Sequence, residues 1–254
     1  MLAGDLRYAL DPACFAREAL NFSPDPWQER ALRWSGKRIL LNCCRQSGKS
    51  TTAAILGLHR ALFYPGSLVL LVSPSLRQSG ELFRKVGEHL QRLEMPPHKV
   101  EDNKLSATFS NGSRIVSLPS TEDTVRGFSG ASLIIEDEAA RVPDELYFAV
   151  RPMLAVSGGR LILMSTPFGK RGHFFKEWTE GSDGWERIEI TAHNCPRISP
   201  AFLEEEKRSL GDWWFRQEYV CEFVETVDQV FYYDQVMTAL SGEVKPLFGG
   251  IENE

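Results

Sequence analysis

The sequence predicts an α/β protein with a mostly parallel central sheet, flanked by helices and followed by a small C-terminal helical subdomain. Short apolar runs rich in β-branched residues alternate with stretches of helical spacing, which is typical of strands joined by crossover helices. Polar segments follow three of these runs, at residues 45–51, 136–138 and 165–167. Because parallel sheets present functional side chains at the carboxyl ends of their strands, we expect one site at one sheet edge.

The elements follow one another in a regular rhythm. The pair Asn111-Gly112 is a two-residue hairpin signal between two of the expected strands. We expect a helical N-terminal region over 1–35, strands over 38–43, 67–73, 104–110, 113–118, 131–136, 160–165 and 185–191, helices over about 49–63 and 75–93, and further helices over 195–231. The predicted organisation is therefore an N-terminal helical region (1–35), a core domain (36–194), a lid-like helical subdomain (195–235) and a linker or tail (236–254).

Composition limits the class of protein. The chain has 254 residues, 43% of them hydrophobic, and a net charge of −5. No apolar run reaches the roughly 18 residues of a membrane span, so a cytosolic protein is expected. The five cysteines show no metal-ligand spacing, which favours reduced thiols over a zinc site. The acidic net charge argues against nucleic-acid binding over the whole surface, but it does not exclude a local basic stripe.

The first polar segment has the properties of a phosphate-binding loop at the start of a helix. Backbone N–H groups and the helix dipole favour an anion there. Lys49 can reach the β- and γ-phosphates, and the Ser50 hydroxyl can bind magnesium. Cys43 stands where the usual pattern has glycine, so the loop is a variant. The candidate nucleotide-binding residues of this loop are Gln46, Ser47, Gly48, Lys49, Ser50 and Thr51, preceded by Arg45.

The second segment supplies carboxylates at the end of an apolar strand. Asp137 would be costly to bury unpaired, and a magnesium ion would resolve that cost. Glu138 can orient and deprotonate an attacking water; the simpler alternative is a charge at a helix N-terminus. Strand alternation points Glu136 away from Asp137, so we expect a structural role for it. The third segment, which contains Ser165 and Thr166, can sense the γ-phosphate.

Two further features are candidates for nucleotide recognition and catalysis. Trp27-Gln28 can recognise adenine, because a glutamine amide offers both a donor and an acceptor, although Trp27 could equally be a core residue. Phe22 could stack on the base. For hydrolysis, an arginine from a neighbouring subunit often stabilises the transferring phosphoryl group. Arg126 is the first candidate for that finger and Arg141 is its rival.

Residues 45–50, 134–140 and 164–169 together resemble the ATPase domain of the large terminase subunit, the DNA-packaging motor of tailed bacteriophages and related viruses. Phe215-Arg216-Gln217-Glu218-Tyr219 resembles the lid subdomain of that family, and Trp27-Gln28 its adenine motif. The resemblance covers about residues 20–235. It implies a P-loop NTPase of the ASCE or RecA-like type.

The resemblance also implies roles for particular residues. Lys49 and Ser50 would bind ATP and Mg²⁺, and Arg45 would contact phosphate or act as a sensor. Asp137 would bind the metal, and Glu138 would be the catalytic glutamate. Ser165 and Thr166 would couple hydrolysis to movement, and Arg126 would be the finger acting in trans. The implied partners are double-stranded DNA, the portal protein, the small terminase subunit and further copies of this chain in a ring, expected to be a pentamer, in the host cytoplasm.

Large terminases normally continue into an RNase H-like nuclease domain. This sequence ends at Glu254, where the linker to that domain is expected, so we expect no DNA cleavage by this chain. Two alternatives remain open. One is a DNA-dependent, helicase-like P-loop ATPase, although a helicase needs a second RecA-like domain. The other is a nucleotide-binding assembly module without motor activity, against which the presence of Glu138 argues.

An acidic protein that holds DNA needs a local basic surface. The expected hairpin offers Lys104 and Arg114. The helix after the second strand offers Arg77 and Arg84, which lie seven residues apart and so on one face. Solvated surface charges are the plain alternative for each of these four. A motor that moves along DNA would contact the backbone rather than particular bases.

Overall fold

The computed structural model describes residues 2–120, 125, 127–225 and 233–240. Its centre is an eight-stranded sheet in the order β3-β4-β5-β2-β6-β7-β1-β8. The six strands from β5 to β8 in that order are parallel, and β3 and β4 add an antiparallel margin. The strands are β1 (Arg38–Cys43), β2 (Leu68–Ser73), β3 (Lys99–Asp102), β4 (Ser106–Phe109), β5 (Arg114–Pro119), β6 (Leu133–Asp137), β7 (Arg160–Ser165) and β8 (Trp185–Ile190).

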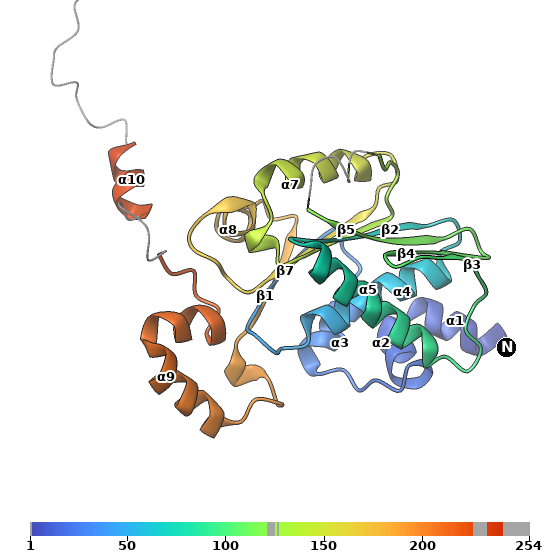
Figure 1. Ribbon diagram of the computed structural model, residues 1–254, viewed down its shortest axis with the longest axis horizontal. Helices are drawn as coiled ribbons and strands as arrows, with labels where there is room; N and C mark the ends of the chain where they lie inside the picture. Colours follow the sequence, from blue (N-terminus) through green and yellow to red (C-terminus); the bar gives the residue numbers. More distant parts are fainter. Residues whose placement is uncertain (1, 121–124, 126, 226–232, 241–254) are drawn as a thin grey trace, which may run out of the picture.

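Helices cover both faces of this sheet (Figure 1). The N-terminal helices lie with α4 and α5 on one face, whereas α7 and α8 lie on the other. The helices are α1 (Leu2–Leu10), α2 (Pro12–Cys14), the π-helical η1 (Phe15–Ala19), α3 (Pro26–Leu32), α4 (Lys49–Phe63), α5 (Leu76–Gln91), α7 (Asp144–Val150), α8 (Gly172–Thr179), α9 (Pro200–Tyr219) and α10 (Tyr233–Ala239), with short 3₁₀ turns η2 (Ala139–Arg141), η3 (Arg151–Leu154) and η4 (Ala192–Asn194).

The central strands are apolar on both faces because both faces are covered. Along β2, Val69 and Leu71 pack towards α4 and α5, while Leu70 and Val72 pack towards α7 and α8. All four are fully buried, and burying such a side chain contributes about 1.5–3 kcal/mol each. This alternation is why a continuous hydrophobic run, rather than a polar-apolar alternation, encodes the central strands.

The register of the parallel strands aligns their carboxyl ends. Asn42 of β1 pairs with Ser165 of β7, and Asp137 of β6 pairs with Met164 of β7. The segments that follow β1, β6 and β7 therefore leave the sheet at the same edge. The fold class expected from the sequence, a P-loop α/β domain with a mostly parallel sheet, is confirmed.

Two local expectations differ from the structure. Strand β3 was not expected, because its sequence is mostly exposed and charged and lacks an apolar pattern. Within Asn111-Gly112 only Gly112 has a left-handed backbone (φ 80°), whereas a two-residue type I′ turn needs both. The loop is longer, and the Phe109 N–H donates to the Ser113 carbonyl (2.8 Å). The side chain of Asn111 instead donates to the Ala61 carbonyl at the end of α4 (2.8 Å).

The described part of the C-terminal region contains the helices α9 and α10, but its details differ from those expected. Ser199 caps α9 by accepting from the Phe202 N–H. Gly211, at φ 77° and ψ 165°, interrupts this helix in the middle. Helix α10 falls partly in the segment expected to be a linker. No helix among the described residues has the length and apolar character to cross a membrane.

Candidate functional site

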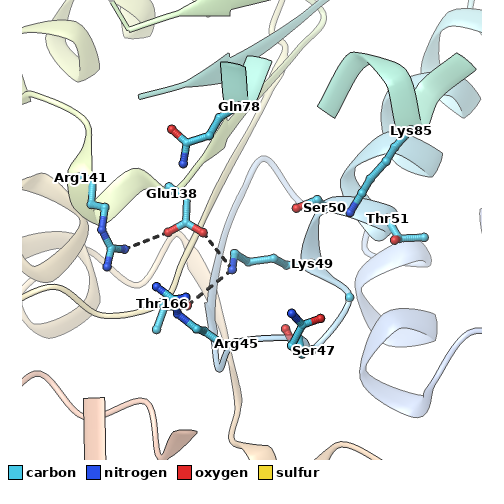
Figure 2. Close-up of a pocket in the computed structure, with 12 residues that line it drawn as sticks. Arg45, Ser47, Lys49, Ser50, Thr51, Gln78, Lys85, Glu138, Arg141 and Thr166 are labelled. Carbon is cyan, nitrogen blue, oxygen red and sulfur yellow. Dashed lines mark hydrogen bonds and ion pairs between the residues drawn. The ribbon is translucent and has the colours of Figure 1, made fainter. Parts of the chain in front are cut away.

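A cavity of about 510 Å³ opens at the carboxyl edge of the sheet. The loop between β1 and α4 forms its floor, and β6, β7 and α5 contribute its walls (Figure 2). It brings together the residues predicted for the phosphate loop with Glu138, Arg141 and Thr166. Its lining consists of Arg45, Gln46, Ser47, Gly48, Lys49, Ser50, Thr51, Gln78, Lys85, Glu138, Arg141 and Thr166.

The backbone of the phosphate loop is held in an uncommon conformation. Gln46 (φ 61°) and Gly48 (φ 95°) are both left-handed, which is rare for residues other than glycine. A Cβ at Gly48 would lie 2.8 Å from Gln28 Nε2 and 3.0 Å from Arg197 Nη2. Gly48 is thus required both by its backbone angle and by its neighbours. It forms the N-cap of α4, so its loop presents backbone N–H groups at the positive end of a 15-residue helix.

Glu138 stands between two cations. Its Oε1 lies 3.0 Å from Lys49 Nζ, and its Oε2 accepts a hydrogen bond from Arg141 Nη1 (3.0 Å). Figure 2 shows both contacts converging on the carboxylate. Burial alone would lower the pKa of Lys49, but Glu138 and Asp137 beside it reverse this and leave the pKa above its ordinary value. Lys49 is therefore charged. Arg141 contacts Glu138 within the same chain, so this contact needs no neighbouring subunit.

Asp137 and Ser50 lie together at the end of β6. The Ser50 hydroxyl donates to Asp137 Oδ2 (3.3 Å), and the Glu138 N–H donates to Oδ1 (3.0 Å). Burial raises the pKa of Asp137 to about 6, although Lys49 opposes this rise. A hydroxyl and a carboxylate this close form an oxygen donor pair of the kind that Mg²⁺ prefers. The two residues expected to bind the metal are thus neighbours.

Ser165 ends β7 and Thr166 follows it, beside the phosphate loop. Both are buried, and the Ser165 hydroxyl donates to the Thr166 carbonyl (2.7 Å). Thr166 Oγ1 accepts a long hydrogen bond from Lys49 Nζ (3.5 Å). The segment expected to sense or couple is therefore in direct contact with the lysine of the loop.

Arg45 is held by a residue far away in the sequence. Its Nε donates to Glu218 Oε2 of α9 (2.5 Å), and its backbone N–H donates to the Glu218 carbonyl (3.0 Å). The hydrogen bond from Arg45 to Glu218 raises the pKa of Arg45. Arg197 donates to the Ser47 carbonyl and pairs with Asp25. Glu218 in the last turn of α9 and Arg197, which precedes α9, thus both contact the phosphate loop.

The structure places Trp27 and Gln28 next to the loop but not in the cavity lining. Trp27 belongs to the hydrophobic core, the alternative weighed for it from the sequence. Gln28 Oε1 accepts from the Asp25 N–H (2.9 Å), and its Nε2 donates to Thr52 Oγ1 (3.1 Å). Both ends of the amide are therefore bonded within the protein. Phe22 lies edge-on to His89 and is also outside the cavity lining.

Behind the second segment, Glu136 points to the opposite face of the sheet, as strand alternation predicted. It is fully buried, and its Oε1 lies 2.6 Å from Nε2 of the equally buried His173. His173 Nδ1 lies 3.1 Å from Asp144 Oδ1, and Tyr147 stacks on the ring at 4.5 Å. Burial would lower the pKa of His173, but the two carboxylates raise it above its ordinary value.

The residues proposed for DNA contact come from three segments, α5, the loop before β4 and strand β5. All four are exposed, but Arg84 is paired with Glu81 and Glu88. Arg114 lies opposite Thr108, whereas Lys104 precedes β4 at the other end of that strand. Arg126 lies outside the described residues.

Sequence reasoning missed several residues of the site, namely Gln78, Lys85, Glu218 and Arg197. Glu218 lies in the segment that resembles the family's lid subdomain, a resemblance that implies no role for this residue. Gln78 and Lys85 follow Arg77 and Arg84 by one residue each. One residue is about 100° around a helix, which turns them from solvent to the cavity.

Known proteins resemble this chain in both sequence and fold. The chain is 27% identical over 250 residues to the large terminase subunit of Thermus phage G20c, an alignment that covers 84% of this chain and 51% of that protein. It thus spans about half the length of the curated relatives it matches. The large terminase ATPase domain of Thermus phage P74-26 superposes with a TM-score of 0.76 at 25% identity, over 85% of this chain and 100% of that one.

The large terminase of a further thermophilic bacteriophage, solved in complex with ADP, shares the fold. Its TM-score is 0.61 at 15% identity, over 87% of this chain and 53% of that one. The family model for the N-terminal part of the large terminase subunit, T4-like-virus type, matches residues 40–237. This match covers most of the chain, including the phosphate loop, the Asp137–Glu138 pair and α9, and the chain therefore belongs to the large terminase subunit family.

Proposed function

We propose that this chain is the ATP-hydrolysing motor domain of a viral large terminase and drives double-stranded DNA into a procapsid. The observation that carries the proposal is that Lys49, Ser50 and Glu138 line one cavity at the helix N-terminus, with Asp137 hydrogen-bonded to Ser50. Family membership supports the same activity. The proposed partners are DNA, the portal protein, the small terminase subunit and other copies of this chain in a ring.

In this proposal the loop binds the phosphates through its backbone N–H groups and Lys49. Ser50 Oγ and the Asp137 carboxylate would hold Mg²⁺, since they lie 3.3 Å apart and are both oxygen donors. When bound, Mg²⁺ neutralises charge on the phosphates. The phosphates compete with Glu138 for Lys49. Release of that ion pair leaves Glu138 Oε1 free to accept a proton from the attacking water.

Arg141 holds the other carboxylate oxygen of Glu138 and so fixes its orientation. Thr166 contacts Lys49 and is the first residue after β7 to register a change at the phosphates. We propose that Ser165 and Thr166 transmit that change from the site to the rest of the sheet. Arg126 would complete the site of a neighbouring subunit, and Arg45 would contact phosphate.

The test is an ATPase assay with and without double-stranded DNA over a range of protein concentrations. We expect turnover that DNA stimulates, and loss of turnover in Lys49→Ala. Hydrolysis that ignores DNA would contradict the motor proposal and favour a general P-loop ATPase. Nucleotide binding without any hydrolysis would favour an assembly module.

The grip on DNA has its own test. Charge reversal at Lys104 and Arg114 should lower DNA affinity and flatten its salt dependence, each lost phosphate contact removing about 0.9 from the slope of log K against log salt. Basal ATPase should remain, because neither residue lines the cavity. Unchanged DNA binding would remove the hairpin and leave Arg77 and Arg84 as the candidates.

A further inference from the structure

Helix α5 forms a wall of the cavity that no sequence motif indicated. It begins directly after β2, and β2 pairs in parallel with β6 so that Val72 lies opposite Glu136. Two residues after Val72 the chain has left β2, and two residues after Glu136 it has reached Glu138. The segment that follows β2 therefore leaves the sheet next to Glu138. The first turn of α5 is placed beside the proposed catalytic carboxylate by the register of two strands.

The side chains of α5 divide into three faces. One face packs into the core and consists of Ser79, Leu82, Val86, His89 and Leu90. A second is exposed and consists of Arg77, Glu81, Arg84 and Glu88. Between them, Gln78 and Lys85 lie seven residues apart, are both half-buried and line the same cavity as Lys49. Residues at this spacing project from one side of a helix.

The amide of Gln78 is oriented by the N-cap of its own helix. The Ser75 hydroxyl donates to Gln78 Oε1 (2.8 Å) and accepts from the Gln78 backbone N–H (3.3 Å). With the oxygen engaged, the amide nitrogen is left as the group that can donate to a ligand. Figure 2 shows the Gln78 amide nitrogen directed towards Glu138. Gln78 thus presents a hydrogen-bond donor near the group that would activate water.

Lys85 brings a positive charge to the opposite part of the cavity. Figure 2 shows its side chain directed into the cavity towards the start of α4, whose Ser50 and Thr51 line the same cavity. Over the ranges that the structure describes, Lys85 makes no ion pair or hydrogen bond. Its neighbour Arg84, in contrast, is paired with two glutamates. The charge of Lys85 is therefore available to a ligand in the cavity.

The other cations of the site are already paired with carboxylates, so a bound triphosphate would need the charge of Lys85. The ammonium group of Lys49 is already opposed by Glu138 at 3.0 Å and by nearby Asp137. Arg45 is opposed by Glu218, and Arg141 by Glu138. A triphosphate carries several negative charges into this half-buried space, where unbalanced charge is costly. Lys85 is a lining cation whose charge is not already matched by a carboxylate within ion-pair distance among the described residues.

We propose that Gln78 and Lys85, here called the α5 wall, bind the triphosphate from the side opposite the phosphate loop. Lys85 Nζ contacts phosphate oxygens beside Ser50, and Gln78 Nε2 donates to the terminal phosphate. Lys85 then favours ATP over ADP, whereas Gln78 acts mainly in the transition state, where it stabilises the charge that spreads over the transferring phosphoryl group. The proposal rests on the proposed ATPase function of the site.

Binding of ATP-γ-S and of ADP to the purified chain, measured by calorimetry, tests this proposal. Lys85→Met should weaken ATP-γ-S binding by about tenfold to a hundredfold, as expected for loss of a charged hydrogen bond, and ADP binding by less. Lys85→Arg should restore most of the difference. The matched control is Lys176→Met, an exposed lysine on α8. An ATP-γ-S to ADP preference in Lys85→Met equal to that of the control would overturn the role of Lys85.

Gln78 is tested by the split between binding and turnover. Gln78→Leu should lower kcat by about tenfold to a hundredfold, within the range for loss of one such donor, while ATP-γ-S affinity changes much less. Gln91→Leu, at the exposed end of the same helix, is the control. Equal kcat in the two variants would overturn the role of Gln78. A thermal melt of each variant separates a loss of fold from a loss of contact.

The failure of the α5 wall and the failure of the nucleotide site can be told apart. Lys49→Ala is measured in the same series. If it binds ATP-γ-S as well as the unchanged chain does, the nucleotide site itself is misassigned. If it loses binding while Lys85→Met and Gln78→Leu match their controls, the site stands and the α5 wall is wrong.

Discussion

At the scale of single residues, the central feature of the site is the Glu138 carboxylate, which contacts both Lys49 and Arg141. Glu138 has a left-handed backbone (φ 54°) and its two oxygens contact different cations. Left-handed residues other than glycine are costly and tend to occur at functional sites. The two left-handed residues thus lie where the proposed reaction takes place: Glu138 where the attacking water would bind, and Gln46 in the loop that would bind the phosphates.

The first prediction concerns this carboxylate. Glu138→Gln keeps the shape of the side chain but removes its basicity, so hydrolysis should fall by about 10²–10⁴-fold. ATP binding should persist because it depends on Lys49 and on backbone groups. Turnover and equilibrium binding of ATP measure the two effects separately. Glu145→Gln, an exposed glutamate on α7, is the control. Retention of more than roughly a tenth of the turnover would assign the base to another group.

The second prediction concerns the glycine of the phosphate loop. Gly48→Ala adds a Cβ 2.8 Å from Gln28 Nε2 on a backbone with φ 95°. We expect loss of nucleotide binding and a fall of about 1–3 kcal/mol in the free energy of unfolding. Gly87→Ala in α5 is the control, because nothing lies within 4 Å of its added Cβ and alanine is favoured in helices. Equal unfolding curves for the two variants would show that the loop relaxes without cost.

At the scale of elements, His173 joins three of them on the face of β6 that lies away from the cavity. It contacts Glu136 of β6 and Asp144 at the start of α7, and it is itself the second residue of α8. Glu136 Oε2 has no hydrogen-bond partner among the described residues, so the charge of Glu136 depends heavily on His173. A buried ion pair therefore holds β6 against the start of α8.

The third prediction follows from this pair. His173→Phe leaves Glu136 buried without its partner and should lower the free energy of unfolding by about 3–5 kcal/mol. The double variant Glu136→Leu with His173→Phe should recover much of the loss, because no buried charge is left unpaired. Arg84→Met, which breaks exposed ion pairs, should cost about 1 kcal/mol or less. Urea unfolding measures all of them, and additive losses in the double variant would contradict the pairing.

At the scale of the whole molecule, two buried histidines couple stability to pH. Burial lowers the pKa of His59 to about 4 and that of His89 to about 4, against about 6.5 in an unfolded chain. Between these values the unfolded chain binds protons that the folded chain excludes. The free energy of unfolding therefore falls as pH drops from about 6.5 towards 4, by up to about 3 kcal/mol for each histidine.

His173 acts in the opposite sense. Its pKa in the folded chain is raised, so its contribution is present below about pH 6.5 and is lost as pH rises through the folded pKa. The fourth prediction is that His59→Gln, which keeps a donor for the Tyr8 carbonyl, reduces the loss of stability between about pH 7 and pH 5. Urea unfolding at both pH values measures this. His98→Gln, at an exposed histidine, should leave the pH dependence unchanged, and an equal dependence in all three proteins would exclude His59.

The fifth prediction concerns assembly. If Arg126 acts in a neighbouring subunit, ATPase activity should rise more steeply than linearly with protein concentration. A mixture of Arg126→Ala and Glu138→Gln proteins should regain some turnover, because a mixed interface pairs one intact site with one intact finger. No recovery at any concentration, with Arg141→Ala the more damaging change, would move the role to Arg141, which already contacts Glu138 in its own chain.

The sequence by itself determined the elements whose signals are local. The phosphate loop, the Asp137–Glu138 pair and the central strands could be read from short patterns, because backbone conformation and strand burial leave their mark within a few residues. The same patterns placed Ser50 and Asp137 in one site, because carboxyl ends of parallel strands meet at one edge. The strand β3 and the Asn111 turn were not predictable in this way, since they depend on neighbours outside the segment.

Only the tertiary structure decided the contacts between distant segments. Glu218 reaches Arg45 across 173 positions of the chain, and His173 reaches Glu136 across 37. Whether Arg84 or Lys85 faces the cavity depends on how α5 is rotated about its axis. That rotation is fixed by the packing of Leu82, Val86 and Leu90 against the core. Side-chain packing between elements leaves no short-range signal in the sequence. Residues such as Gln78, Lys85 and Glu218 could therefore be assigned to the site only from the tertiary structure.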